Sequence, residues 1–157
     1  IDVKSGKSDV SAPVYSHLVY DIVPDERVVL DQPDILIVEG LNVLQPARRR
    51  SDGTTALAVS DFFDFTVFVD ARTAFIRQWY IDRFFALRAT AGRDPKSYFR
   101  PYAEMSQGEA LRTATTFWDT INGPNLELNI RPTRGRATAI LRKGENHAVN
   151  WVRIRKV

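Results

Sequence analysis

The chain has 157 residues, 44% apolar and 26% charged, with a formal net charge of +3. Such a composition excludes a disordered or fibrous protein, and the chain is long enough to bury a core. The absence of cysteine excludes a disulfide scaffold and a cysteine-based zinc site, and is compatible with a reducing cytoplasm. With no membrane-length apolar stretch and no signal-peptide pattern, we expect a soluble protein. The small basic excess suits phosphorylated small molecules at least as well as nucleic acid.

Residues 4–13 are rich in Lys, Ser and Gly and predict a loop. Within it, Gly6, Lys7 and Ser8 imitate the end of a phosphate-binding P-loop. A P-loop needs a second glycine five positions earlier, where this chain has Ile1, and a following helix, where it has Pro13. We therefore reject a P-loop at this position.

Residues 15–21 place an imidazole between two phenols in a segment that predicts a short strand or an extended loop. Alternation puts Tyr15 and His17 on one face, where His17 is suited to proton exchange near neutrality. A half-buried aromatic cluster with a hydrogen-bonded histidine is an equally good interpretation. A turn at Pro24 and Asp25 and a short edge strand at residues 28–30 follow.

Residues 33–45 (PDILIVEGLNVLQ) contain an unbroken apolar run that predicts a strand buried on both faces, as in a parallel sheet. Glu39 and Gly40 come directly after this run. Ligands of open α/β sheets bind beyond the carboxyl ends of the strands, so Glu39 is a candidate to face a binding crevice. The alternative is a loop carboxylate that caps nearby amides.

Residues 62–71 predict a second strand, which also ends in an acid, Asp70. The helical spacing of apolar residues over residues 73–88 then completes half of a βαβ unit. Arg83 lies at the edge of the aromatic stripe on this helix and is suited to bidentate phosphate contact. The alternative role of Arg83 is to cover the aromatic stripe with its aliphatic stem. Arg48, Arg49 and Arg50 predict a solvated loop.

Residues 94–97 end that helix, and the aromatic loop that follows is a candidate lid or a packed connection. Ser106 to Glu109 is a capping box that opens an amphipathic helix. We expect this helix to stop at residues 122–125 (NGPN). The amide of Asn122 is there either to bind ligand hydroxyls or only to end the helix.

The last part of the chain predicts a basic loop at residues 131–136, a strand at 137–142, a turn at 144–147 and a half-exposed strand at 149–157. We find no internal repeat and no convincing linker. The sequence therefore predicts one α/β domain over residues 1–157.

Seven segments, in order along the whole chain, resemble the bacterial type I pantothenate kinases of the P-loop kinase superfamily. These segments are DVKSG (2–6), APVYSHLVYD (12–21), PDILIVEGLNVLQ (33–45), QWYIDRF (78–84), DPKSYF (94–99), INGPNLELNIRPTRGRA (121–137) and NHAV (146–149). The resemblance implies a mostly parallel sheet flanked by helices, here incomplete at its amino-terminal side. It also implies ATP-dependent phosphorylation of pantothenate with Mg²⁺, in a cytoplasmic homodimer inhibited by coenzyme A, with no nucleic-acid or membrane partner.

The resemblance further implies residue roles. Glu39 matches the acid that helps to hold magnesium, and Arg83 matches the arginine on the transferring phosphate of the nucleotide. His147 matches a residue near the adenine. The positions that match pantothenate-binding residues are Tyr15, His17, Tyr80, Tyr98, Phe99 and Asn122.

The chain also departs from the family pattern. Leu87 and Gly92 stand where enteric members usually carry phenylalanine, which predicts a wider aromatic pocket. The family's Walker A loop and catalytic aspartate have no counterpart from Ile1 onward, so we expect a carboxyl-terminal part that is inactive alone. A non-catalytic relative that binds pantothenate or coenzyme A is the alternative, and a basic nucleic-acid module is the least supported.

Overall fold

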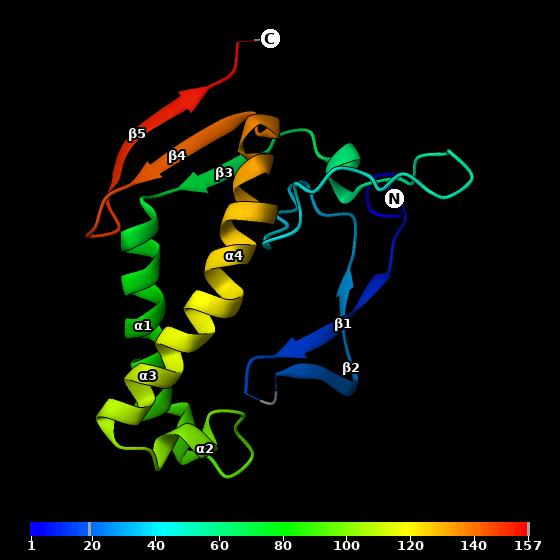
Figure 1. Cartoon of the computed structure of the whole chain (residues 1–157). Helices are drawn as coiled ribbons and strands as arrows, with labels where there is room; N and C mark the ends of the chain where they lie inside the picture. Colours follow the sequence, from blue (N-terminus) through cyan, green and yellow to red (C-terminus); the bar gives the residue numbers. More distant parts are fainter. Residues whose placement is uncertain (19, 157) are drawn as a thin grey trace. The chain divides into compact units, whose positions relative to one another are not determined.

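The computed structural model describes residues 1–18 and 20–156 and shows a mixed α/β protein, which confirms the predicted class (Figure 1). Its contacts divide the chain into two compact units. Unit 1 comprises residues 1–37 and 81–114, and unit 2 comprises residues 38–80 and 115–157. Among the described residues, no helix has the length and apolar character needed to cross a membrane.

Unit 1 contains an antiparallel hairpin of β1 (Val10–Ser16) and β2 (Asp21–Leu30). The loop predicted for residues 4–13 is thus wrong in its last part, and the short strand predicted at 28–30 is the end of a longer one. Pro13 is tolerated because a two-stranded ribbon has only edge strands, and the register shifts between Pro13 and Tyr15.

The helical part of unit 1 follows the sequence prediction closely. The helix α1 (Thr73–Ala89) spans the predicted residues 73–88 and passes from unit 2 into unit 1. The short segments η2 (Ala91–Arg93) and α2 (Arg100–Ala103) lead to α3 (Gln107–Phe117). The predicted capping box is confirmed, since the Ser106 amide donates to Glu109 Oε2 at 2.9 Å and the Glu109 amide donates to Ser106 Oγ at 3.3 Å.

Unit 2 is built on a three-stranded sheet in the order β3-β4-β5. The strands are β3 (Val67–Asp70), β4 (Ala139–Lys143) and β5 (Val149–Ile154), with β3 parallel and β5 antiparallel to β4. A short 3-10 helix, η1 (Val59–Phe62), precedes β3. A buried core cluster of this unit contains Leu44, Phe68, Ala137 and Ile140. The predicted strands at 62–71, 137–142 and 149–157 are therefore present, the first and last shortened.

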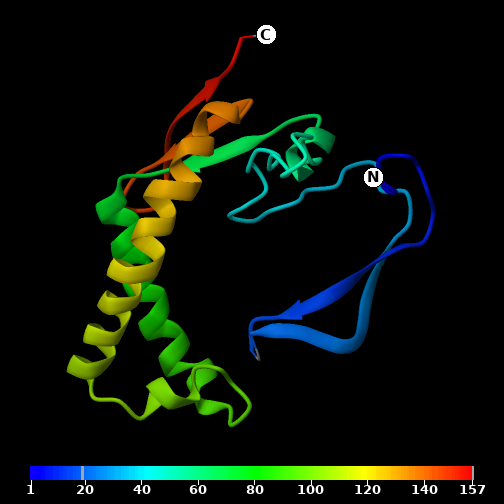
Figure 2. The ribbon, with the colours of Figure 1, turned by 45° about the vertical axis from the view of Figure 1, so that its right-hand side comes forward.

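The helix that begins at α3 does not stop at residues 122–125, as the sequence predicts. It continues through η3 (Trp118–Asn122), α4 (Gly123–Asn125), η4 (Leu126–Ile130) and η5 (Arg131–Arg136), as Figure 2 shows. The predicted basic loop at 131–136 is therefore a 3-10 helix. Pro124 lacks an N–H and lies in the first turn of α4, directly after a π-helical turn. The wider turn accommodates the Gly-Pro pair that would end an ordinary α-helix.

The strand predicted within residues 33–45 is also wrong. Residues 35–40 are non-repetitive and residues 41–44 form a turn. The side chains of Ile35 and Ile37 are 81% and 85% exposed. An apolar run becomes a buried strand only when neighbouring strands complete its hydrogen bonds, and within residues 1–18 and 20–156 no strand pairs with this run. Only its end is packed, with Leu44 in the core of unit 2.

A buried carboxylate joins three elements of unit 2. Asp70 lies at the end of β3 and is 5% exposed. Its Oδ2 forms an ion pair with Arg142 Nη1 of β4 at 2.8 Å and accepts a hydrogen bond from Arg134 Nε of η5 at 3.1 Å. Arg131 Nη1 lies 3.9 Å from its other oxygen. A buried acid is stable only when its charge is compensated in this way.

We predict that Asp70→Asn lowers the free energy of unfolding by about 2 to 3 kcal/mol. This loss is below the range for fully buried pairs because the arginines are 23–34% exposed. Urea denaturation with an unchanged m-value measures it. Asp119→Asn is the control, since Asp119 is exposed and 3.9 Å from Arg77. Equal midpoints for the two variants would contradict the prediction.

Candidate functional site

The turn between β1 and β2 gathers aromatic side chains in unit 1. The ring centroids of Tyr15 and His17 are 5.2 Å apart, as the predicted shared face requires, and those of Tyr15 and Tyr20 are 6.2 Å apart. Tyr20 has a left-handed backbone with φ of 63°, and its amide donates to the Ser16 carbonyl at 2.9 Å. This tight turn brings Tyr20 back towards Tyr15.

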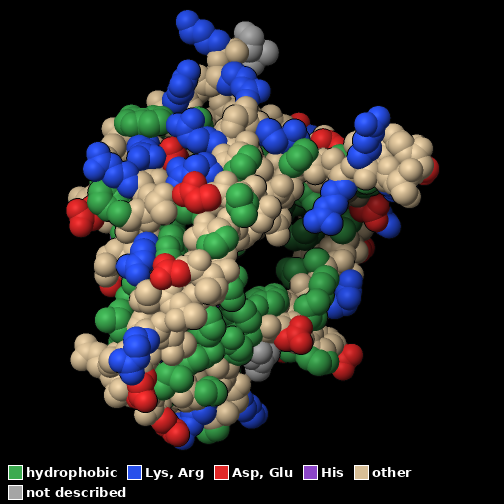
Figure 3. Space-filling view, in the orientation of Figure 1, with side chains coloured by type: hydrophobic (Ala, Val, Ile, Leu, Met, Phe, Trp, Pro, Cys, Tyr) green, Lys and Arg blue, Asp and Glu red, His purple; other side chains and the backbone are tan. Residues whose placement is uncertain are grey.

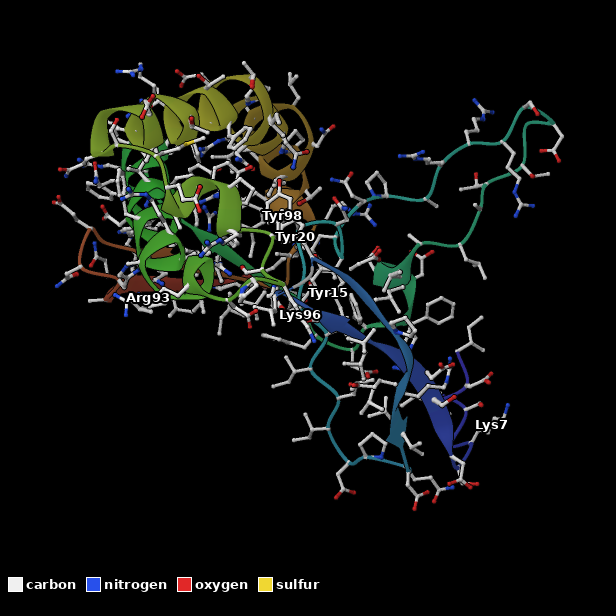
Figure 4. The ribbon with its side chains drawn as sticks, turned by 90° about the horizontal axis from the view of Figure 1, so that it is seen from below. Lys7, Tyr15, Tyr20, Arg93, Lys96 and Tyr98 are labelled. Carbon is white, nitrogen blue, oxygen red and sulfur yellow. The ribbon has the colours of Figure 1, made fainter. Side chains whose placement is uncertain are left out.

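The loop before α2 adds a fourth ring. Tyr98 stacks on Tyr20 with centroids 4.7 Å apart, and its amide donates to the Leu18 carbonyl at 2.9 Å. Figure 4 shows Tyr15, Tyr20 and Tyr98 gathered together. The structure therefore brings together three predicted pantothenate residues, Tyr15, His17 and Tyr98. We call Tyr15, His17, Tyr20 and Tyr98 the phenol cluster.

Phe99 lies beneath this cluster rather than beside it. Its side chain is 8% exposed and packs against Phe84 and Tyr102, with centroids 6.3 and 6.1 Å away. Tyr98 is 46% exposed and contacts Phe99 with centroids 5.5 Å apart. Of the two aromatic residues predicted to line the pocket, Tyr98 presents a surface and Phe99 supports it from the core.

Gly92 lies in a closely packed part of unit 1. A Cβ atom at Gly92 would lie 3.0 Å from Ala103 Cβ and 3.2 Å from the Phe99 carbonyl oxygen. The segment around α2 therefore packs directly against this glycine. A phenylalanine at this position would require these neighbouring atoms to move, and the wider pocket expected from Leu87 and Gly92 stays a prediction.

In unit 2, Tyr80 and Asn122 both lie near Trp118. The Tyr80 and Trp118 ring centroids are 5.8 Å apart, and Asn122 Nδ2 donates to the Phe117 carbonyl at 3.4 Å. A Cβ on Gly123 would be 3.3 Å from Trp118 Nε1, so the chain after Asn122 runs close to this indole. The amide of Asn122 bonds to its own helix without ending it.

His147 lies in the turn between β4 and β5 and stacks on Trp79 of α1, with centroids 4.2 Å apart and planes 27° apart. An open hollow lies beside this turn. Three of its lining residues are basic, and lysine and arginine side chains gather over β4 and β5 in Figure 3. The residues lining the hollow are Arg72, Phe75, Arg142, Lys143, Gly144, Glu145, Asn150 and Trp151.

The two predicted catalytic residues are not joined to these groups. Arg83 is exposed on α1 and Glu39 is exposed in the non-repetitive segment. No described hydrogen bond or ion pair involves either side chain. Among the described residues, no group of three or more acids, histidines or cysteines is placed to hold a metal ion.

The sequence interpretation did not select Tyr20, Trp79 or Asp70 as site residues. Tyr20 joins its cluster only through a left-handed turn, which alternation along a strand does not predict. Trp79 lies beside the apolar stripe of the helix and was not selected as a site residue, although its neighbour Tyr80 was. Asp70 was visible as a strand-end acid, but the arginines that surround it come from residues 131–142, far along the chain.

Comparison with known proteins decides the family. The model of the phosphoribulokinase/uridine kinase family matches residues 1–100. The chain belongs to this family. It is 62% identical over 157 residues to a pantothenate kinase from Nocardioides and 64% identical to one from Cutibacterium acnes. Each match covers 100% of this chain and 48% of the relative.

A pantothenate kinase from Haemophilus influenzae is 56% identical over 155 residues, which are 99% of this chain and 49% of that protein. The chain thus spans about half the length of the curated relatives that it matches. The resemblance to pantothenate kinases seen in the sequence is confirmed by these family relatives along essentially the whole chain.

The phenol cluster gives a test of its own. Desolvation raises the pKa of Tyr15 above its ordinary value, and the charges of Tyr20 and Asp21 raise it further. We predict that Asp21→Asn lowers the pKa of Tyr15 and that Asp25→Asn, on the same strand, leaves it unchanged. A spectrophotometric titration at alkaline pH, compared with that of Tyr15→Phe in each background, measures this.

Because the raised pKa favours the neutral phenol in the folded state, its contribution to stability is complete below the pKa of an unfolded tyrosine, about 10. It is lost as pH rises through the folded pKa. Identical titrations for Asp21→Asn and Asp25→Asn would refute the placement of Asp21 beside Tyr15.

Proposed function

We propose that this chain is the carboxyl-terminal part of the catalytic domain of a pantothenate kinase. The reaction is ATP-dependent phosphorylation of pantothenate to 4′-phosphopantothenate, in coenzyme A biosynthesis. The observation that carries the proposal is the 62–64% identity, over all 157 residues, to proteins named pantothenate kinase. The phenol cluster supports it, because it unites residues proposed for one substrate from two distant segments.

In the proposed reaction the primary hydroxyl oxygen of pantothenate attacks the γ-phosphorus of ATP, and the bond from phosphorus to the leaving oxygen of ADP breaks. The proton of the hydroxyl passes to a general base. Enzymes accelerate this transfer mainly by positioning the reactants and stabilising charge. Arg83 is the proposed source of fixed positive charge at the transferring phosphate. Its exposure and lack of a described ion-pair partner leave its guanidinium available for this contact.

Substrate binding is assigned to side chains that offer both hydrogen bonds and apolar surface. Phenols, imidazole and amide groups match the hydroxyls, amide and carboxylate of pantothenate. We assign this role to Tyr15, His17, Tyr80, Tyr98 and Asn122, with Phe99 as the support of Tyr98. His147 is assigned to the nucleotide.

Magnesium is the metal proposed for this site. Kinases bind Mg²⁺ through one or two carboxylates together with phosphate oxygens and water, and the ion neutralises phosphate charge. Among the described residues, Glu39 is suited to one such carboxylate contact. Its side chain is exposed, and no described hydrogen bond or ion pair involves it. We further propose that the full-length protein is a cytoplasmic homodimer and that coenzyme A inhibits it.

The direct test is an assay of the full-length protein with ATP and pantothenate, with 4′-phosphopantothenate and ADP as the expected products. Calorimetric titration with pantothenate and with coenzyme A accompanies it. Binding of these ligands without phosphoryl transfer would support the alternative, a non-catalytic relative. If the protein neither binds these ligands nor transfers phosphate, both the proposed function and its alternative are overturned.

We predict that His17→Ala in the full-length enzyme raises the KM for pantothenate about tenfold, the effect of one lost hydrogen bond to a substrate, and the KM for ATP less than about twofold. Steady-state kinetics with each substrate varied in turn measures both constants. His147→Ala is the matched control and should show the reverse order. Equal changes in both constants for His17→Ala would remove it from the pantothenate pocket.

We predict that Glu39→Gln lowers kcat about tenfold or more, because a magnesium contact is lost, while the melting temperature changes little since the side chain is exposed. Turnover as a function of magnesium concentration measures the effect. Asp34→Asn, an exposed acid five residues earlier in the chain, is the control. An unchanged rate and magnesium dependence would contradict this role.

A further inference from the structure

The turn that carries His147 is held only partly by its own bonds. The Gly144 amide donates to the Ala148 carbonyl at 2.8 Å, and the His147 amide donates to the Gly144 carbonyl at 3.1 Å. His147 has a left-handed backbone with φ of 65°, which is uncommon for a residue with a side chain. These contacts fix the backbone of the turn. They leave the direction of the exposed imidazole to be set by a neighbour.

Trp79 is that neighbour, and within unit 2 it makes two contacts with the turn and one with the last residue of β4. Its Nε1 donates to the Glu145 carbonyl at 2.8 Å. Its ring stacks on the imidazole of His147, with centroids 4.2 Å apart. Lys143 Nζ lies 5.3 Å from the ring centroid, within the range of a cation–π contact. One side chain of α1 therefore contacts both potential ligand-binding side chains, His147 of the turn and Lys143 at the end of β4.

Trp79 is itself supported from the preceding helical turn. Phe75 lies four residues earlier on α1, with ring centroids 6.3 Å apart, and the Arg72 guanidinium carbon lies 5.7 Å from the Phe75 centroid. Residues four apart on a helix share a face, so Phe75 restricts the side chain of Trp79. The indole is thus placed by a regular helix rather than by a loop.

We propose that Trp79 is a positioning residue for the nucleotide, which it affects through His147 and Lys143. This inference rests on the proposed function, because it takes the adenine nucleotide as the ligand of His147. The stack covers one face of the imidazole and leaves the other face and the ring edge accessible to a base. Lys143 is held beside it, where an ammonium group suits an anionic ligand.

The experiment uses full-length protein, two variants of Trp79 and one control variant. Trp79→Leu removes both the stack and the hydrogen bond, and Trp79→Phe keeps a ring but removes the donor. We expect Trp79→Leu to raise the KM for ATP about tenfold and Trp79→Phe about threefold, with the KM for pantothenate within about twofold. Phe65→Leu, at an exposed aromatic residue of unit 2 that precedes β3, should change neither constant.

A double-mutant cycle with His147→Ala tests whether Trp79 changes the KM for ATP through His147. If Trp79 acts through His147, Trp79→Leu has much less effect on the KM for ATP once the imidazole is absent. A purely structural role predicts a lower melting temperature and equal changes in both KM values, and that result would overturn the proposal. If Trp79→Leu does not fold, Trp79→Phe decides, and an unchanged KM for ATP overturns the inference.

The same variants separate this inference from the proposed function. Wild-type protein that phosphorylates pantothenate, with variants unchanged towards ATP, refutes only the role of Trp79. Wild-type protein that transfers no phosphate refutes the proposed function, and calorimetric titration with ATP then decides the inference. Binding weakened about tenfold by Trp79→Leu sustains it. Equal affinities, or no ATP binding by wild-type protein, overturn it.

Discussion

The arrangement of unit 2 depends on one buried carboxylate. Asp70 is placed by β3, and the arginines that compensate its charge come from β4 and from the end of the long helical run. Removal of a charge from water is costly unless partners are fixed beside it, so each arginine fixes an element relative to β3. Arg142 directly precedes Lys143, and the ion pair thus also anchors the strand that leads into the His147 turn.

The candidate site depends on side chains that meet through turns and helix faces. The phenol cluster joins the β1–β2 turn to the loop before α2, through the stacked rings of Tyr20 and Tyr98 and the bond from the Tyr98 amide to Leu18. In unit 2, Trp79 plays a corresponding part for the β4–β5 turn. In both places an aromatic ring from one element packs against an exposed residue of another.

Local signals in the sequence were reliable where the structure is local. The spacing over residues 73–88 predicted α1, and the Ser106–Glu109 pair predicted the start of α3, because helix faces and caps depend on residues three or four apart. The same local logic failed at residues 122–125. There Gly123 and Pro124 are stop signals for an α-helix, but a π-helical turn carries the chain past them.

The sequence by itself determined the α/β class, the helix α1, the capped start of α3, the shared face of Tyr15 and His17, and the resemblance to a kinase family that the relatives confirm. The tertiary structure decided what depends on partners distant in the chain. It exposed the apolar run at residues 35–38, because burial needs neighbouring strands and not only apolar side chains. It also paired Tyr20 with Tyr98, Trp79 with His147 and Asp70 with three arginines. Such contacts arise from the path of the folded chain, which no local pattern encodes.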